Sequence, residues 1–234
     1  MNHENRSYLK PVRHFELQIP VGTTSLNADL VIPENAVGAV IFAHGTGSNR
    51  QSPRNVFVAR TLQQTGLATL LLDLVPPGRE QEKFDIQLMA GRLITATYWF
   101  EAKHAENRMP LGYFGASTGA AAALAAAADV GRDISAVVSR GGMPDLAGDR
   151  IRKVTAPTLL IVGGEDTEVM DHNNKAYAQL SGQKDLEIIP GATHLFEEPG
   201  ALEAVAHLAA DWFLNAFGVI QEVPAKPMRS AARL

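Results

Sequence analysis

Residues 115–119 read Gly-Ala-Ser-Thr-Gly and place Ser117 between an apolar run and an alanine-rich segment. A G-x-S-x-G sequence between a strand and a helix forms a sharp turn that exposes the serine hydroxyl at the end of a sheet. Small residues are needed at 115 and 119 because a side chain there would collide with the adjacent strand and helix. So short a pattern recurs by chance, so it predicts a nucleophile only if the chain also supplies a base, an acid and an oxyanion hole.

An acid and a base follow Ser117 in the order that such a turn requires, first Asp or Glu and then His. Asp166 lies in a Gly-Gly-Glu-Asp segment after one buried run, and His194 lies after the next expected strand. In this arrangement the histidine takes the proton of the serine and the acid orients the histidine. Glu165 is a rival acid, and the Gly-Gly-Glu-Asp segment is also ordinary turn chemistry.

Other histidines compete with His194 for the role of base. His207 lies at i, i+4 spacing from Glu203 and Asp211, which could mimic a metal-binding face. The polar stripe of an amphipathic helix explains these three residues better, so the sequence predicts no metal site. His172 lies near the start of an expected helix, where we expect it to be solvated.

The loop that follows the first buried run supplies the expected oxyanion hole. It reads His-Gly-Thr-Gly-Ser over residues 44–48. We expect the backbone N–H groups of Thr46 and Thr118 to stabilise a developing oxyanion, with Gly47 as the alternative to Thr46. His44 is expected to brace the loop through hydrogen bonds, and a plain glycine turn is the other interpretation of this segment.

Two arginines near expected strand ends raise the question of an anionic substrate. Arg140 directly follows a buried run, and Arg79 lies in the loop after another. Either guanidinium could bind a carboxylate of the substrate. An arginine in such a place more often pairs with an acid of its own chain, and for Arg140 the candidates are Asp145 and Asp149.

These residues need a scaffold that brings them to one edge, and the apolar pattern predicts one. Short buried runs alternate with stretches of helical period, which is typical of an α/β fold with a mostly parallel central sheet and helices on both faces. The expected strands are 15–19, 26–32, 38–43, 67–72, 111–116, 135–139, 158–162 and 186–189. The expected helices are 56–64, 84–104, 117–129, 169–181 and 201–216. Ligands on such sheets bind beyond the carboxyl ends of the strands, where all the candidate residues lie.

The length of the chain and the positions of its Gly and Pro residues favour one domain without a large cap. Its 234 residues, 46% hydrophobic and 20% charged, suffice for a single α/β domain, which we place at 1–217. The segment 218–234 lacks periodicity and is expected to be a loosely ordered C-terminal extension. Only residues 141–157 separate two expected strands, which is too few for a helical cap over the site.

Composition excludes several classes of partner and chemistry. The net charge of −4 argues against a nucleic-acid-binding surface, and the absence of cysteine excludes disulfides and a thiolate nucleophile. The polar first residues and the lack of a long apolar run predict neither a signal peptide nor a membrane span. We expect a cytoplasmic protein, for which a homo-oligomer is possible.

Taken together, these residues resemble the α/β-hydrolase superfamily, and more specifically its dienelactone-hydrolase-like branch. The matching stretches are FAHGTGSNRQSPRN (42–55), ATLLLDL (68–74), GYFGASTGAAAAL (112–124), VVSRGGMPDLAG (137–148), APTLLIVGGEDTEV (156–169) and PGATHLFEEPGALEAVA (190–206). They look like the small hydrolase domains that some bacteria carry alone or fused to a phosphoribosyltransferase-like domain, and no such partner domain is expected in these residues. Dienelactone hydrolases proper use cysteine where this chain has Ser117, which favours a serine esterase.

The residues and the resemblance predict a cofactor-independent serine hydrolase of the carboxylesterase type. Its partner would be a small carboxylic ester or lactone, cleaved through an acyl-enzyme intermediate by Ser117, His194 and Asp166. A thioesterase, amidase or acyltransferase with the same triad is an alternative. A non-catalytic binding module on the same fold is another alternative, and a metal-dependent hydrolase is the least favoured.

Overall fold

A computed structural model describes residues 12–219 of the chain. The strands are β1 (Val12–Val21), β2 (Thr24–Pro33), β3 (Gly38–Ala43), β4 (Leu67–Leu72), β5 (Leu111–Ala116), β6 (Ile134–Arg140), β7 (Thr158–Gly163) and β8 (Lys184–Ile189). The α-helices are α1 (Pro53–Gln64), α2 (Ile86–Lys103), α3 (Thr118–Val130), α4 (Thr167–Gln179) and α5 (Ala201–Ala216). Short 3-10 segments are η1 (Glu80–Phe84), η2 (Gly131–Asp133) and η3 (Pro144–Lys153).

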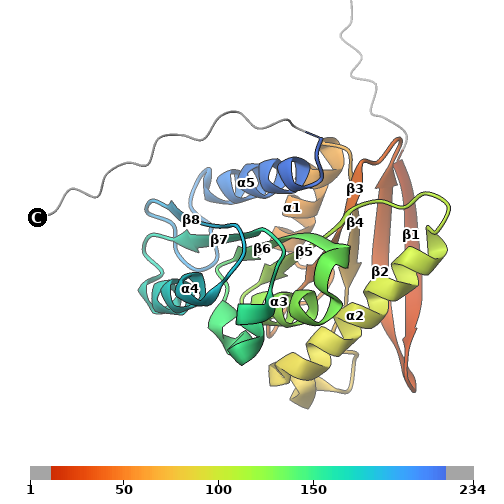
Figure 1. The fold of residues 1–234 in the computed structure, drawn as a ribbon, viewed down its shortest axis with the longest axis horizontal. Coiled ribbons are helices and arrows are strands. Elements are labelled where there is room, and N and C mark those ends of the chain that lie inside the picture. The colour runs from red at the N-terminus through yellow and green to blue at the C-terminus, as the bar shows by residue number, and fades with distance from the viewer. Residues whose placement is uncertain (1–11, 220–234) are drawn as a thin grey trace, which may run out of the picture.

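The strands form one eight-stranded sheet with the order β1-β2-β4-β3-β5-β6-β7-β8 (Figure 1). β1 and β2 form an antiparallel hairpin, and β2 pairs antiparallel with β4. All the remaining neighbours, from β4 through β3 to β8, are parallel. The prediction of a mostly parallel sheet is therefore confirmed, and the carboxyl ends of six strands meet at one edge.

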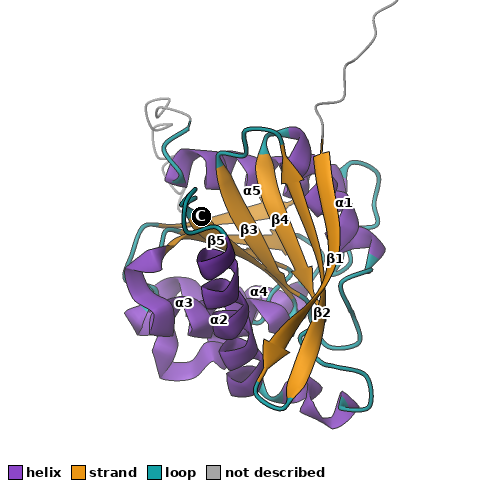
Figure 2. Ribbon diagram, turned by 90° about the vertical axis from the view of Figure 1, so that its right-hand side faces the viewer, coloured by secondary structure: helices purple, strands orange, loops and turns teal. Residues whose placement is uncertain are grey.

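Helices cover both faces of the sheet, α1 and α5 on one and α2, α3 and α4 on the other (Figures 1 and 2). Every residue of β3, β4 and β5 is buried because these strands are covered on both faces. Side chains alternate between the two cores: Val40 and Phe42 pack under α1 and α5, whereas Ile41 packs toward α2 and α3. The long apolar runs of the sequence follow directly from this double coverage.

α3 is the helix that fixes the position of Ser117, and it owes its close packing to alanine. Each of residues 120–127 of this helix is at most 1% exposed. α3 contacts α2, η3 and strand β5, so it is enclosed on several sides. Small side chains let its backbone approach the sheet closely, and a close-packed interior resists displacement.

The expected elements are all present, with shifts at some ends. α1 begins at Pro53, three residues earlier than expected, because proline is tolerated in the first turn of a helix. α2 begins only at Ile86, after the Asp85 side chain accepts the backbone N–H of Leu88 at 2.9 Å and caps the helix. η1 occupies the residues just before it.

The segment between β6 and β7 carries only η3, so no large cap domain lies over the sheet in the described part of the chain. Residues 220–234, most of the expected extension, lie outside the described residues, as do residues 1–11 of the expected domain. None of the helices between residues 12 and 219 is long and apolar enough to cross a bilayer.

Candidate active site

Ser117 lies on the turn between β5 and α3 in a backbone conformation that few residues adopt. Its φ is 52° and its ψ is −126°, and a positive φ at a residue other than glycine costs about 1–3 kcal/mol. Backbone hydrogen bonds hold the strained turn. Ser117 N–H donates to Arg140 O at 3.2 Å, and Ser117 O accepts from the N–H groups of Ala120 at 3.1 Å and Met143 at 3.2 Å. The serine therefore has the strained strand-to-helix geometry of a nucleophile elbow.

The two glycines of the motif are required by close backbone contacts. A Cβ atom on Gly119 would lie 2.2 Å from Ala43 O, and a Cβ atom on Gly115 would lie 2.5 Å from Ala120 Cα. Both distances are shorter than any tolerable contact, and in both cases the neighbour is backbone that cannot rotate away. The expected collision with the adjacent strand and helix is confirmed.

His194 and Asp166 form a hydrogen-bonded pair at the same edge of the sheet. His194 Nδ1 donates to Asp166 Oδ2 at 2.7 Å, and the side chains are 37% and 9% exposed. Because Nδ1 is engaged, Nε2 is the nitrogen that can accept a proton. The rival acid, Glu165, is exposed, and its backbone N–H donates to Ala192 O. The structure brings Asp166 rather than Glu165 to the histidine.

Two loops in backbone contact fix the geometry of this pair. A Cβ atom on Gly163, at the end of β7, would lie 2.3 Å from Ala192 O in the histidine loop. Phe196, two residues after His194, has a φ of 55° and is 1% exposed, so the loop is anchored in the core directly after the histidine. The orientation of the ring is therefore set by rigid surroundings.

His194 lies over the end of β6, the strand next to that of Ser117. A Cβ atom on Gly141, which follows β6, would lie 3.2 Å from His194 O and 3.6 Å from His194 Nδ1. Among the described residues no hydrogen bond joins Ser117 Oγ to His194 Nε2. Such contacts are commonly long in a free enzyme and shorten when substrate binds, so the arrangement is compatible with a triad.

The two threonines expected at the oxyanion hole contact each other. Thr46 N–H donates to Thr118 Oγ1 at 2.9 Å, Thr46 Oγ1 donates to Lys83 O at 3.1 Å, and the two hydroxyl oxygens lie 3.1 Å apart. Thr118 is the first residue of α3, so its own N–H has no partner within the helix. Thr46 N–H, in contrast, is already bonded to a side chain that would have to rotate before this group could bind an oxyanion. Gly47, the alternative donor, has a φ of 76° on the same loop.

His44 braces this loop, as predicted. Its Nε2 accepts the N–H of Leu74 at 2.9 Å and its Nδ1 donates to Gly45 O at 3.0 Å, which fixes one neutral tautomer. The side chain is 3% exposed. Burial lowers the pKa of His44 below its ordinary value, more than the Gly45 carbonyl and the charge of Asp73 raise it, so the ring is neutral near pH 7.

A further brace of the loop escaped the sequence analysis. Asp73, which follows β4, accepts the backbone N–H of Arg50 at 2.8 Å and pairs with its guanidinium. The same guanidinium lies 3.1 Å from Asp29 of β2. The only signal in the sequence was an aspartate at the end of an apolar strand, which does not by itself indicate its partner.

The two arginines that were candidates for substrate binding have different surroundings in the structure. Arg79 is 46% exposed and donates to Glu82 at 2.9 Å, so its charge is engaged within the chain. Glu82 also accepts from Arg92, which is buried and donates in addition to Leu74 O at 2.8 Å. Arg79 thus belongs to a structural ion-pair network beside the site.

Arg140 is 7% exposed and lacks the internal partner that the sequence suggested. Asp145 instead bonds to His172 Nδ1 at 2.7 Å, and neither Asp145 nor Asp149 forms an ion pair with Arg140. The expected pairing of Arg140 is wrong because η3 carries Asp145 toward α4. His172 is only partly solvated, since its side chain is 26% exposed and bonds to Asp145.

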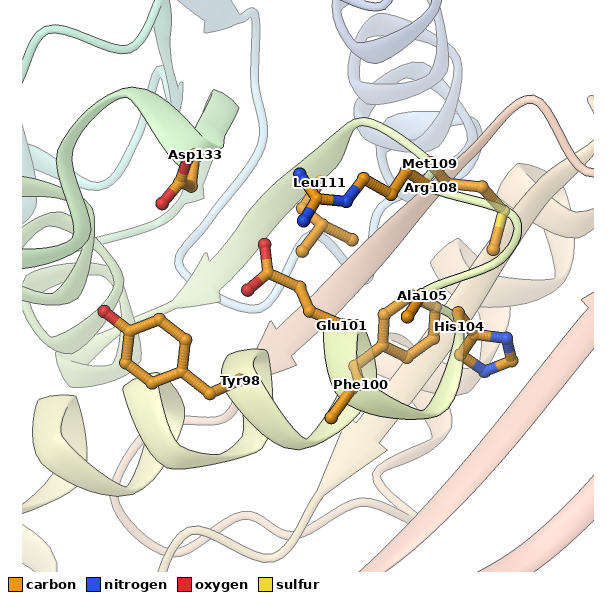
Figure 3. Close-up of a pocket in the computed structure, with 10 residues that line it drawn as sticks. Tyr98, Phe100, Glu101, His104, Ala105, Arg108, Met109, Leu111 and Asp133 are labelled. Carbon is orange, nitrogen blue, oxygen red and sulfur yellow. The ribbon is translucent and has the colours of Figure 1, made fainter.

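Cavities occur at both edges of the sheet. One of about 380 Å³ borders the oxyanion loop and is lined by residues that include His44, Gly47, Pro77 and Lys83. A larger one of about 460 Å³ lies at the opposite edge, where β5 begins. Figure 3 shows Glu101 and Arg108 turned into this second cavity. This second cavity is remote from Ser117, whereas the smaller one borders the loop of residues 44–49.

The three residues that could mimic a metal face, Glu203, His207 and Asp211, are exposed on α5. In the part of the chain that the structure describes, no group of three or more His, Cys, Asp or Glu side chains could hold a metal ion. The exposed polar stripe of an amphipathic helix accounts for these three residues.

A solved structure of a dienelactone hydrolase from Anabaena variabilis is 51% identical to this chain, with a TM-score of 0.84. The match covers 87% of this chain and 98% of that one. This chain belongs to the dienelactone-hydrolase-like branch of the α/β-hydrolase superfamily. Est1E from Butyrivibrio proteoclasticus shares the same α/β-hydrolase fold at 19% identity, with a TM-score of 0.75 over 87% of this chain and 99% of its own. Membership of this branch supports the identification of the protein as a hydrolase.

Two curated Mycobacterium tuberculosis proteins match this α/β-hydrolase chain at 52% identity over 208 residues, and both carry a provisional name as phosphoribosyl transferases. The match covers 88% of this chain and 47% of each relative, so the chain spans about half the length of these proteins. No family model matches the chain.

Proposed function

We propose that this protein is a serine hydrolase that cleaves small carboxylic esters or lactones through an acyl-enzyme intermediate. The observation that carries the proposal is Ser117 on a strained turn beside the His194–Asp166 pair, whose Nδ1–Oδ2 distance is 2.7 Å. Membership of the dienelactone-hydrolase-like branch supports the reaction class. A serine in place of the cysteine of dienelactone hydrolases proper favours an esterase.

We assign each step of the proposed reaction to a named atom. Ser117 Oγ attacks the acyl carbon while its proton passes to His194 Nε2, and Asp166 stabilises the imidazolium that forms. The proton then moves from His194 to the leaving alkoxide, which departs as an alcohol. A water molecule gives a proton to His194 and attacks the acyl-enzyme, which releases the carboxylic acid and restores Ser117.

The tetrahedral intermediate carries a negative oxygen near the start of α3. Thr118 N–H lies at the amino end of this helix, where the backbone dipoles favour negative charge. We assign it as one oxyanion donor, and Thr46 N–H or Gly47 N–H as the second. Removal of one such donor typically lowers kcat by about 100- to 1000-fold.

Substitution of the nucleophile tests the proposal directly. Ser117→Ala should abolish both hydrolysis of p-nitrophenyl acetate and covalent labelling by a fluorophosphonate probe, with an unchanged circular dichroism spectrum. Ser181→Ala is the matched control, because Ser181 bonds to Arg152 O on the exposed surface, and it should leave both readouts intact. A wild-type protein that neither hydrolyses the ester nor takes up the probe would refute the serine-hydrolase assignment.

Thioesterases, amidases and acyltransferases can use the same triad, and the substrate separates them. A panel of one acyl group presented as an oxygen ester, a thioester and an amide, each with and without an acceptor alcohol, distinguishes these activities. We expect the highest kcat/KM for the oxygen ester in water. A preference of more than tenfold for the thioester would move the assignment to a thioesterase.

A further inference from the structure

Residues 140–143 join the end of β6 to η3, and both ends of this segment bond to the turn of Ser117. The carbonyl of Arg140 accepts the Ser117 N–H at 3.2 Å, and the Met143 N–H donates to Ser117 O, also at 3.2 Å. Ser117 has a strained φ of 52°, and such a conformation persists only where the surrounding contacts fix it. The segment 140–143 therefore helps to keep the serine in its conformation.

The middle of the same segment bonds to the elements on either side of the candidate acid. Gly141 N–H donates to Ile161 O of β7 at 2.8 Å, and Gly142 O accepts from Asn173 Nδ2 of α4, also at 2.8 Å. Asp166 lies between these two elements and directly precedes the first residue of α4. The segment thus connects the strained turn with both elements that position the acid.

Asn173 is 0% exposed, and the stability of the fold does not by itself account for an amide at this position. Its Nδ2 donates to Gly142 O and to Val169 O of its own helix, at 2.8 Å each, so both amide protons are used. Its Oδ1 is buried and has no hydrogen-bond partner among residues 12–219. A buried acceptor without a partner lowers stability, which offsets the contribution of the two donated bonds. The bond to Gly142 therefore points to a role in positioning.

A second contact joins α4 to the same region of the chain. His172 Nδ1 of α4 bonds to Asp145 Oδ1 of η3 at 2.7 Å, two residues after Met143. The two elements lie side by side (Figure 1). Because the His172–Asp145 bond keeps α4 beside η3, loss of the Asn173 amide should shift residues 140–143 without releasing the helix.

We propose that Asn173 is a positioning residue of the hydrolase, which holds residues 140–143 where Ser117 is aligned with the His194–Asp166 pair. This inference rests on the proposed hydrolase function. Asn173 acts through the backbone of this segment, since its amide protons are bonded to carbonyl groups there and in α4. A displacement of about 1 Å can cost about 100-fold in rate even when the substituted residue lies away from the chemistry. A buried contact behind the site can therefore control kcat.

Removal of the amide tests the inference by separating kcat from KM. Asn173→Ala should lower kcat for p-nitrophenyl acetate by about 10- to 100-fold and leave KM within about twofold of the wild-type value. The rate of labelling by a fluorophosphonate probe should fall by the same factor, because both reactions need an aligned Ser117. Asn174→Ala is the matched control, since Asn174 is the next residue of α4 and is exposed. It should leave both rates unchanged.

A second substitution at the same position removes the bond to Gly142 alone. A serine hydroxyl in a helix bonds to the carbonyl four residues earlier, so Asn173→Ser keeps a donor for Val169 O. Its hydroxyl ends one atom short of the position of Nδ2 and should not reach Gly142 O. Asn173→Ser should therefore lower kcat as Asn173→Ala does, and it provides the measurement if the alanine variant fails to fold.

A buried residue of α2 separates positioning from a general loss of stability. Thr97 is 0% exposed, and its hydroxyl lies 2.6 Å from Tyr113 Oη. Thr97→Val should lower the thermal unfolding midpoint because it leaves a buried hydroxyl without a partner, yet it should keep the wild-type kcat. Wild-type kcat in the Asn173 variants would overturn the inference. So would an equal loss of kcat in Thr97→Val.

Backbone hydrogen exchange separates this inference from the proposed function. The Met143 amide should exchange about tenfold faster in the Asn173 variants than in the wild type, and Thr97→Val should not change it. A fall in kcat without faster exchange would overturn a route through residues 140–143. If the wild type hydrolyses no ester but the exchange still rises, the hydrolase proposal fails and the connection from α4 to the serine turn stands. If esters are hydrolysed and the variants match the wild type, the hydrolase proposal stands and the inference fails.

Discussion

The two edges of the parallel sheet differ in chemistry more than in shape. The edge where the strands begin has cavities of about 460 and 670 Å³, and the edge where they end has one of about 380 Å³. The edge where they end has a strained serine, a strained Phe196, a bonded histidine–aspartate pair and an unpaired buried arginine. Positive φ also occurs at the first edge, but there it falls on Asn35, a residue type that tolerates it. Unsatisfied or strained groups, rather than open volume, therefore distinguish the edge that carries the candidate site.

The acid of the proposed triad should show the largest contrast between the edges. Asp166→Asn should lower kcat for p-nitrophenyl acetate by about 1000- to 10,000-fold, because an amide cannot stabilise the imidazolium and favours the wrong tautomer. Asp133→Asn, in the cavity of Figure 3, should leave kcat unchanged. Steady-state kinetics on the two purified variants measures both effects.

Glu165→Gln is the control within the same loop, since Glu165 is exposed and Asp166 is bonded to His194. It should retain the wild-type kcat. Full activity in Asp166→Asn together with loss of activity in Glu165→Gln would assign the role of the acid to Glu165. It would contradict a catalytic role for the bonded His194–Asp166 pair.

Two buried arginines are expected to contribute differently to the free energy of unfolding. Arg92 is 3% exposed and donates to Leu74 O and Glu82, whereas Arg140 is 7% exposed and has no partner among residues 12–219. Arg92→Met should therefore lower the free energy of unfolding by about 1–3 kcal/mol, because it leaves the buried Leu74 carbonyl without its donor, while Glu82 keeps Arg79 as a partner. Arg140→Met should change it by less than about 1 kcal/mol or raise it. Urea denaturation measures both, and an equal loss in the two variants would show that Arg140 has a structural partner.

Much of the edge where the strands end could be predicted from the sequence, because its residues lie in short segments directly after predicted strands. The elbow glycines follow from close contacts of neighbouring residues, and the order of Ser117, Asp166 and His194 follows from the alternation of strands and helices. The brace formed by His44 was likewise predictable, since a histidine directly after a buried strand needs bonding partners. The hydrophobic periodicity and the positions of the Gly and Pro residues between elements were sufficient to predict all of these features.

The partners of long polar side chains could not be predicted in the same way. Asp145 bonds to His172 instead of Arg140, and Asp73 bonds to Arg50. These contacts depend on how η3 and the loop after β3 are oriented in space, and apolar periodicity carries no information about that. The engagement of Thr46 N–H by Thr118 Oγ1 is a further contact between residues far apart in the chain.

That threonine contact gives a smaller predicted effect. If Thr46 N–H binds the oxyanion, it must first leave Thr118 Oγ1, at the cost of one neutral hydrogen bond of about 0.5–1.5 kcal/mol. Thr118→Val removes the competing acceptor and should raise kcat about 2- to 10-fold, whereas Thr118→Ser should leave it unchanged. A fall in kcat in Thr118→Val would assign the second donor to Gly47 N–H and give the hydroxyl a role in holding the loop.

The smallest contrast is between histidines at the two edges and appears in the pH dependence of stability. Burial lowers the pKa of His44 at the edge of the candidate site, and burial followed by the charge of Arg13 lowers that of the more exposed His104 at the other edge. Below about pH 6.5 the unfolded state therefore binds a proton that the folded state does not, so stability is lost as the pH falls. His44→Gln should flatten the dependence of the free energy of unfolding on pH between 7 and 5, by at most about 1 kcal/mol at pH 6. His104→Gln should flatten it less, because a partly exposed ring is desolvated less. Urea denaturation at pH 5, 6, 7 and 8 compares them, and equal slopes in the two variants would contradict the special burial of His44.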